Sequence, residues 1–326
     1  MQAIVATQSG GPEALAAVQR PEPTPGPGEL LLAVHAAGVN RADVLQRRGL
    51  HPPPEGASDV LGLEAAGEVV AVGADVEGWE PGDRACALLT GGGYADRVVV
   101  PAAVALPWPA TLTAAEAACA YEVYATAFDN LLVRAGLSRG ERALVHGGTS
   151  GVGTAAVQLA QRAGATALVT VGSDRKARAA LQQGAEAAIV YPEEDFVERV
   201  LALTDQHGVE AILDVVGGDY LERNLRALAD DGHLVVIGLQ GGRRAELDLA
   251  WLLGRRLTVA GSTLRARPLA HKEALAARLR EEVWPGFADG SLRPVVDSVH
   301  PLAEAAQAHA RMESGEHIGN IVLAVG

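Results

Sequence analysis

Strand and helix patterns alternate through the middle of this chain, beginning with ALVHGGTSGVGTAAVQLA at residues 143–160. There a β-type run enters a glycine-rich turn, and an amphipathic helix follows the turn directly. Five further β-type runs alternate with helical segments as far as LTVAG at 257–261. Strands joined by helical crossovers form a parallel sheet, so we predict a doubly wound, six-stranded Rossmann sheet.

The residues before and after this α/β series have a different pattern. The first third contains short β-type runs separated by glycine and proline, which is typical of a rolled β domain. Thr113 and Glu116 then form a capping-box signature at the start of a predicted helix over 114–132. The tail has a predicted helix over 268–288 and then returns to strands. We therefore predict a discontinuous β domain, residues 1–122 and 266–326, interrupted by a dinucleotide-binding domain over residues 123–265.

Composition excludes several classes of protein. A chain of 326 residues is long enough for two domains, and its formal net charge of −13 argues against nucleic acid as a partner. Its two cysteines, Cys86 and Cys119, lie in apolar stretches and are expected in the core rather than in a disulfide. The sequence has no signal-peptide pattern and no apolar run that could span a membrane, so a cytoplasmic protein without membrane contact is expected.

The glycine-rich turn has the context of a pyrophosphate-binding loop. Gly148, Ser150 and Gly153 occupy the three spacings of the G-x-G-x-x-G pattern, with Gly151 and Val152 between them. Small residues let a pyrophosphate approach the backbone, and the helix N-terminus stabilises its charge. The alternative is a tight strand-to-helix turn without a ligand. The five strands that follow favour dinucleotide binding.

The end of the second strand favours NADPH over NADH. An NAD site usually places an acidic residue there for the ribose 2′-hydroxyl, whereas this chain has Ser173, Arg175 and Lys176. A serine and two cations suit a 2′-phosphate, although Asp174 would repel one if it pointed inward. A solvated helix start is the alternative for the two cations. Tyr191, after the third strand, is either a stacking residue near the adenosine phosphate or an ordinary strand-end tyrosine.

The whole chain resembles the medium-chain dehydrogenase/reductase superfamily, and in particular its zinc-free quinone oxidoreductase (zeta-crystallin-like) branch. The resemblance rests on NRADVLQRRG, PPPEGASDVLGLEAAGEVVAVG, GDRACALLTGGGYADRVVVP, HGGTSGVGTAAVQLA and HIGNIVL. It implies a GroES-like β domain interrupted by a Rossmann domain, with the active site in the cleft between them. It also implies a homodimer formed through the Rossmann sheet at LTVAGS.

The resemblance also implies the absence of zinc. Zinc-containing members bind the metal through a cysteine and a histidine, where this chain has Asn40 and Leu63. Neither side chain supplies a thiolate or an imidazole. Glu64 remains, but a single carboxylate does not make a zinc site, so no metal is expected.

Several residues gain roles from the resemblance. Asn40 would touch nicotinamide or substrate, His51 would line the substrate pocket or donate a proton, and Thr126 would lie near the nicotinamide. Each has a structural alternative: a turn asparagine, a loop histidine and a buried helix threonine. The remaining positions near the cofactor are Gly217, Gly238, Leu239 and Asn320. Asp43 is equally well explained as a helix cap, and His146 is expected to be structural.

The expected function is therefore NADPH-dependent, zinc-independent reduction of small quinones or other electron-poor substrates. A quinone needs no Lewis acid, because its reduced oxygen anion is weakly basic and positioning supplies most of the catalysis. Two alternatives remain: reduction of an activated C=C bond with NADPH, and an NADPH-binding protein with little turnover.

Overall fold

The computed structural model describes residues 1–326, and the chain divides into two compact units. The first unit contains residues 1–125 and 264–326, and the second contains residues 126–263. A β domain interrupted by an α/β domain is the architecture predicted from the sequence. None of the helices combines the length and the hydropathy that a membrane-spanning helix needs.

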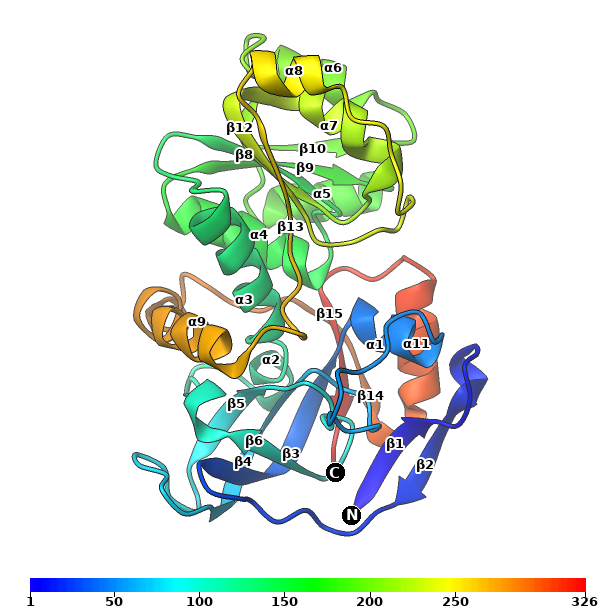
Figure 1. The fold of residues 1–326 in the computed structure, drawn as a ribbon, viewed down its shortest axis with the longest axis vertical. Helices are drawn as coiled ribbons and strands as arrows, with labels where there is room; N and C mark the ends of the chain where they lie inside the picture. The colour runs from blue at the N-terminus through cyan, green and yellow to red at the C-terminus, as the bar shows by residue number, and fades with distance from the viewer. The chain divides into compact units, whose positions relative to one another are not determined.

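The second unit is built on the predicted parallel sheet of six strands (Figure 1). The strands lie in the order β10-β9-β8-β11-β12-β13, and every neighbouring pair is parallel. Chain order reverses next to β8, which creates the switch point where ligands bind in sheets of this kind. The strands are β8 (Arg142–His146), β9 (Thr166–Val171), β10 (Ala187–Val190), β11 (Val209–Asp214), β12 (Leu228–Val236) and β13 (Thr258–Gly261).

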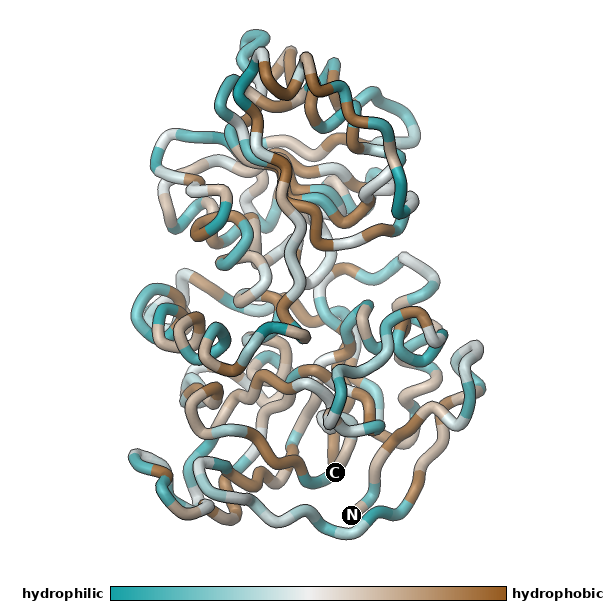
Figure 2. Tube along the Cα trace, in the orientation of Figure 1, coloured by the Kyte–Doolittle hydropathy of each residue, from teal (hydrophilic) through white to brown (hydrophobic).

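Helices connect these strands and cover the sheet. The core between them contains Leu144, Leu168, Ile212 and Leu234, all fully buried. Figure 2 shows the hydrophobic residues concentrated along the strands, with hydrophilic residues in the connecting loops. The helices are α4 (Gly151–Arg162), α5 (Asp174–Gln182), α6 (Phe196–Leu203), the short η4 (Gly218–Tyr220), α7 (Leu221–Ala227) and α8 (Leu249–Gly254).

The first unit contains a seven-stranded, mostly antiparallel sheet and a separate two-stranded ribbon, β1–β2. Its path is β14-β15-β3-β4-β5-β7, and β6 pairs with β3. The strands are β1 (Gln2–Ala6), β2 (Leu15–Gln19), β3 (Glu29–Val39), β4 (Glu64–Val72), β5 (Arg84–Leu88), β6 (Arg97–Pro101), β7 (Ala105–Pro107), β14 (Val296–Pro301) and β15 (Asn320–Ala324).

Helices of one to four turns complete the first unit. They are η1 (Pro12–Ala14), α1 (Arg41–Arg47), η2 (Ala102–Val104), α2 (Ala114–Ala117), α9 (Leu269–Glu282), α10 (Trp284–Asp289), η5 (Leu302–Glu304) and α11 (Ala305–Glu313). The predicted single helix over 268–288 is wrong, because it is divided between α9 and α10. The break lies next to Pro285, which cannot donate a backbone hydrogen bond.

The predicted helix over 114–132 is also interrupted. Thr113 and Glu116 do form the predicted capping box, but α2 ends at Ala117. A second helix, α3 (Glu122–Ala127), then leads into the π-helix η3 (Phe128–Arg134). The Glu122 N–H donates to a carboxyl oxygen of Glu64 at 2.9 Å. That donor therefore bonds to the buried carboxyl group, and a new helix starts at this point.

Local capping and strand starts set three other helix boundaries. Asp195 and Asp248 cap α6 and α8 through their carboxylates, so these helices begin at Phe196 and Leu249. Helix α7 ends at Ala227, because β12 begins at Leu228. Side-chain acceptors at the N-terminus set the first two boundaries.

Candidate active site

The glycine-rich turn lies at the carboxyl end of β8, next to the switch point of the sheet. Gly147 makes the turn with a φ of +73°, a left-handed conformation that favours glycine. A Cβ on Gly148 would lie 2.3 Å from the Val169 side chain, and one on Gly153 would lie 2.3 Å from the Gly147 oxygen. The turn thus packs tightly against both β9 and the start of α4. The G-x-G-x-x-G pattern did not identify Gly147, although the two adjacent glycines in the sequence could have indicated it.

Ser150 caps the 12-residue helix α4. Its Oγ accepts a hydrogen bond from the Gly153 N–H at 3.0 Å. Gly151 and Val152 open the first turn, where backbone N–H groups have no intrahelical acceptor. A backbone without bulky side chains, at the positive end of a long helix, fits the pyrophosphate of a dinucleotide.

The ends of β9 and β10 carry the residues predicted to distinguish NADPH from NADH. Ser173 caps α5 by accepting from the Lys176 N–H at 3.4 Å. Arg175 is exposed and Lys176 is half-buried on the first turn of the same helix. Tyr191 is 49% exposed, and its hydroxyl lies 3.2 Å from the position a Cβ would occupy on Gly172. These residues belong to neighbouring strand ends at one edge of the sheet.

A buried network of polar side chains lies at the ends of β8 and β11. Asp214 accepts from the Gly217 N–H and, at 3.1 Å, from Asn224 Nδ2, while the Asn224 oxygen bonds His146 Nε2 at 2.7 Å. Burial lowers the pKa of His146 to about 4, so the ring is a neutral structural group, as predicted. These hydrogen bonds hold Gly217 in a left-handed turn with a φ of +81°.

Gly238 and Leu239 follow β12 at the same edge of the sheet. A Cβ on Gly217 would lie 3.0 Å from the Leu239 side chain and 3.1 Å from the Gly238 oxygen, so the three residues form one surface. Leu239 is 60% exposed, which is unusual for a leucine. Thr126, at the end of α3, is half-buried, and its carbonyl accepts from Asn130 Nδ2 at 2.7 Å.

In the first unit, Asn40 and Glu64 form a buried pair. Asn40 follows β3 directly and donates from Nδ2 to Glu64 Oε1 at 3.0 Å. Glu64 Oε2 accepts from the Glu122 N–H. Gly38 leaves room for this carboxyl group, since a Cβ there would lie 2.3 Å from Glu64 Oε1. Burial, reinforced by the nearby Glu122, raises the pKa of Glu64 to about 8, so the group is mostly protonated at neutral pH.

Asp43 connects the start of α1 to the turn at Gly62. Its carboxylate accepts from the Asn40 N–H at 2.8 Å and from the Gly62 N–H at 3.1 Å. The predicted capping role is therefore confirmed, and the same carboxylate also fixes the turn that leads into Leu63 and Glu64. Burial raises the pKa of Asp43 to about 6. Backbone and side-chain donors offset part of that burial cost.

A relay of hydrogen bonds connects Asp43 to the far side of this unit. Arg47, fully buried, faces His309 Nδ1 at 3.3 Å, and because arginine only donates, Nδ1 is the acceptor. Burial lowers the pKa of His309 to about 3, so the ring is neutral and its proton is on Nε2. Nε2 lies 3.1 Å from the Tyr94 hydroxyl, which donates to Asp43 at 3.1 Å. Asn40 thus rests on a buried and directional scaffold.

The residues at the zinc-ligand positions do not fit a zinc ion. Leu63 is a buried alkyl chain, and the Asn40 amide is bonded to Glu64, whose two oxygens are both occupied. The chain has no group of three or more His, Cys, Asp or Glu side chains that could hold a metal ion. The nearby Cys86 and Cys119 are both buried. Burial raises the pKa of Cys119 well above the usual value for a thiol, so it is not poised as a thiolate ligand.

His51 and Asn320 complete the predicted positions in this unit. His51 is half-buried in the loop after α1, and burial together with the positive charge of Arg265 lowers its pKa. Asn320 opens β15, whose Ile321 pairs with Val39, so it lies at the same sheet end as Asn40. Its Nδ2 donates to the Val295 carbonyl at 3.0 Å.

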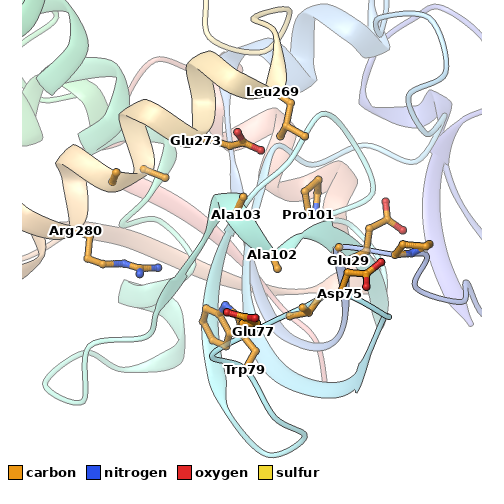
Figure 3. Close-up of a pocket in the computed structure, with 15 residues that line it drawn as sticks. Glu29, Asp75, Glu77, Trp79, Pro101, Ala102, Ala103, Leu269, Glu273 and Arg280 are labelled. Carbon is orange, nitrogen blue, oxygen red and sulfur yellow. The ribbon is translucent and has the colours of Figure 1, made fainter.

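Two cavities in the first unit have different characters. The larger, about 580 Å³, lies beside α9, η2 and the loop containing Asp75, Glu77 and Trp79, and Figure 3 shows Glu273 and Arg280 facing it from α9. None of the predicted site residues lines it. The smaller cavity is lined by Leu63, Leu88, Leu89, Glu122, Leu264, Arg265 and Lys272. It borders the Asn40–Glu64 pair through Leu63 and Glu122. We therefore place the candidate site on this side.

The structure thus groups the predicted residues into two sets, one in each unit. In the second unit, the predicted cofactor-binding residues lie at the carboxyl edge of the parallel sheet. In the first unit, Asn40 and Asn320 lie at one end of the mostly antiparallel sheet. Sequence reasoning missed Asp214, Asn224 and Arg265. Lys272 lies seven residues after Arg265 and is one of only two lysines in the chain, so it could have drawn attention to this region.

Comparisons with known proteins agree with this architecture. Residues 26–110 match the alcohol dehydrogenase GroES-like domain, and residues 151–280 match the zinc-binding dehydrogenase family, a stretch that contains neither Asn40 nor Leu63. Mouse quinone oxidoreductase is 30% identical over 327 residues, 99% of this chain and 97% of that protein. The crystal structure of Escherichia coli quinone oxidoreductase complexed with NADPH has a TM-score of 0.90 at 31% identity, covering 99% of this chain and all of that one.

A third relative is much longer than this chain. One phenolphthiocerol/phthiocerol polyketide synthase of Mycobacterium tuberculosis is 33% identical over 307 residues. The match covers 90% of this chain but only 13% of that protein. The chain therefore spans a small fraction of some of the curated relatives it matches.

Proposed function

Because the chain belongs to the quinone oxidoreductase branch of the medium-chain dehydrogenase/reductase superfamily, we propose that it uses NADPH to reduce small quinones by hydride transfer without a catalytic metal. The observation that carries this proposal is the glycine turn of residues 147–153, which opens a 12-residue helix at the switch point of a six-stranded parallel sheet. That geometry supports a dinucleotide pyrophosphate. The donor set around Asn40 supports chemistry that needs no zinc.

NADPH is the proposed cofactor because of the residues after β9 and β10. When bound, NADPH supplies the hydride and the two electrons of the reaction. Ser173 and the cations of Arg175 and Lys176 would receive the 2′-phosphate, and Tyr191 would pack near it. The exposed Leu239, with Gly217 and Gly238, would form the apolar surface for the nicotinamide ring.

The acceptor is proposed to bind beside Asn40. The hydrogen bond to Glu64 fixes the orientation of the Asn40 amide. The side chain is therefore preorganised to position the ring of the acceptor. His51 would line the acceptor pocket, and Thr126 would contact the nicotinamide. The lowered pKa of His51 favours the neutral imidazole near pH 7. A neutral imidazole at this position would carry no positive charge, and it could orient a water molecule that supplies the proton.

The test is NADPH oxidation, followed at 340 nm with a series of quinones and with 2-alkenals. A higher rate with quinones supports the proposal, and a higher rate with alkenals supports reduction of an activated C=C bond instead. Tight NADPH binding with no turnover on either would identify an NADPH-binding protein with little activity. Affinity for NADH, measured in parallel, tests the proposed role of Ser173, Arg175 and Lys176.

We also propose that the chain forms a homodimer through β13. This strand is at the edge of the Rossmann sheet, and its Val259 is 38% exposed. Leu249, Trp251 and Leu253 on α8 are exposed as well, at 66%, 41% and 80%. An exposed apolar sheet edge is a pairing surface. Light scattering of Val259→Lys should give a monomer; an unchanged dimer would place the interface elsewhere.

A further inference from the structure

Arg265 is a buried cation whose terminal nitrogens have no partner. The residue is 7% exposed, and only its Nε is engaged, donating to the Thr90 carbonyl at 2.9 Å. Nη1 and Nη2 are both buried and make no hydrogen bond within the protein. An unpaired buried guanidinium is costly, because it loses hydration without replacement. Folding alone gives no reason to keep it there.

The surrounding structure holds this guanidinium in place. Lys272, 6% exposed, donates from Nζ to the Arg265 carbonyl at 2.7 Å. The Nε bond to Thr90 fixes the plane of the guanidinium group. Both residues line the smaller cavity beside Leu63, Leu88 and Leu89. A rigid donor group against apolar walls is a preorganised binding site for an acceptor atom.

The charged groups around Arg265 do not neutralise it through hydrogen bonds. Asp43 is close enough to act on it electrostatically, but its oxygens accept from Asn40, Gly62 and Tyr94. The positive charge of Arg265 also acts on His51 and Lys272. Together with burial, which has the larger effect, it lowers the pKa of both groups.

Glu122 lines the same cavity, yet it accepts no hydrogen bond from either Nη.

The cavity has the size of a single polar atom. About 10 Å³ is open to the centre of a water-sized molecule, which is the space that one water needs. A carboxylate or a phosphate would need more room, whereas one carbonyl oxygen fits with its ring outside. Two adjacent nitrogens of one guanidinium can both donate to such an oxygen.

We propose that Arg265 binds the carbonyl oxygen of the acceptor and stabilises the negative charge that develops on it. The inference rests on the proposed function, since it places the oxygen of the same substrate. Hydride transfer from NADPH adds one hydrogen and two electrons to the acceptor and leaves NADP⁺. The electron pair displaced from the conjugated system settles on the carbonyl oxygen, as a phenolate from a quinone or an enolate from an enone. Water then supplies the proton that completes the product.

The kinetic experiment compares Arg265→Gln and Arg265→Lys with wild type, and Arg278→Gln serves as the control. Arg278 forms a surface pair with Glu282 on α9, so its loss changes net charge without reaching the cavity. The proposal predicts that Arg265→Gln lowers kcat/KM for the acceptor about 100-fold, the usual effect of removing an oxyanion donor. Arg265→Lys should restore part of the loss, and NADPH affinity should stay unchanged. A loss of NADPH affinity that accounts for the rate defect would overturn the proposal.

Two measurements that need no turnover separate this proposal from the proposed function. Thermal unfolding of Arg265→Met should give a Tm equal to or above that of wild type, because an unpaired buried charge is removed. A clearly lower Tm would mean that Arg265 is a structural residue. With NADP⁺ bound, 4-nitrophenol serves as a probe for the reduced acceptor. Its pKa, measured by visible absorbance, should be lower on wild type than on Arg265→Gln, and equal values would overturn the proposal even if no quinone is reduced.

Discussion

The substitution Glu64→Gln tests the most strongly perturbed carboxyl group near the candidate site. Glu64 is 1% exposed and receives two N–H donors, from Asn40 at 3.0 Å and from Glu122 at 2.9 Å. Its pKa is about 8, compared with 4.5 for an ordinary glutamate, because burial penalises the charge more than the two donors favour it. The glutamine amide has only one acceptor oxygen, so it cannot accept a hydrogen bond from both N–H groups. One N–H would then face an NH₂ group, at a cost of about 1–3 kcal/mol.

The sign of the pH dependence follows from the raised pKa. Below pH 4.5 the group is protonated in both the folded and the unfolded state, and its contribution to stability is fully present. Between pH 4.5 and about 8 the unfolded chain releases the proton while the folded protein retains it, so the free energy of unfolding falls. The full difference is on the order of 5 kcal/mol, at about 1.4 kcal/mol for each pH unit. Glutamine does not titrate and escapes this loss.

Wild type should therefore be more stable than Glu64→Gln near pH 5, and the difference should shrink and reverse as the pH approaches 8. Urea unfolding followed by tryptophan fluorescence measures it, because Trp79, Trp108 and Trp284 all lie in the first unit. Glu68→Gln on the same strand controls for the loss of one carboxylate. A stability difference that stays constant from pH 5 to pH 8 would mean that folding does not raise the pKa of Glu64.

Three further predictions concern the cofactor, the turn and the metal. Lys176→Ala should weaken NADPH binding about 10-fold or more and leave NADH nearly unchanged; an unaltered NADPH/NADH ratio, measured by fluorescence titration, would remove Lys176 from the site. Gly148→Ala should cost about 1–3 kcal/mol of stability, because its Cβ would lie 2.3 Å from Val169. Gly254→Ala, where nothing lies within 4 Å of the added Cβ, should cost nothing. Elemental analysis of purified protein should find no stoichiometric zinc, and a full equivalent would contradict the interpretation of Asn40 and Leu63.

The parts of the fold that sequence predicted well depend on local patterns. The six parallel strands follow from apolar β-type runs that alternate with helical segments, and the turn before α4 follows from its glycines. Thr113 and Glu116 also fixed a helix start through contacts three residues apart. The break before α3 could not be seen in this way, because it depends on a hydrogen bond between Glu122 and Glu64, 58 residues apart.

The candidate site was predictable to a similar extent. Residues adjacent to strand ends, such as Ser173 and Gly217, could be identified because parallel strands end at one edge. Arg265 could not, since its importance lies in the partners that its terminal nitrogens lack. Asp214 was missed for the opposite reason: its role depends on buried donors, one of them from Asn224 on a helix. Burial and pairing of this kind emerge only in three dimensions.

The proposed function depends on direct hydride transfer from NADPH to a quinone. A single-turnover experiment measures this transfer, with enzyme in excess over NADPH that carries deuterium at the transferred position of C4. Direct transfer should give a loss of absorbance at 340 nm that requires the quinone and is slower for the deuterated cofactor. A loss without quinone, or no loss from a protein that binds NADPH tightly, would exclude hydride transfer to the quinone.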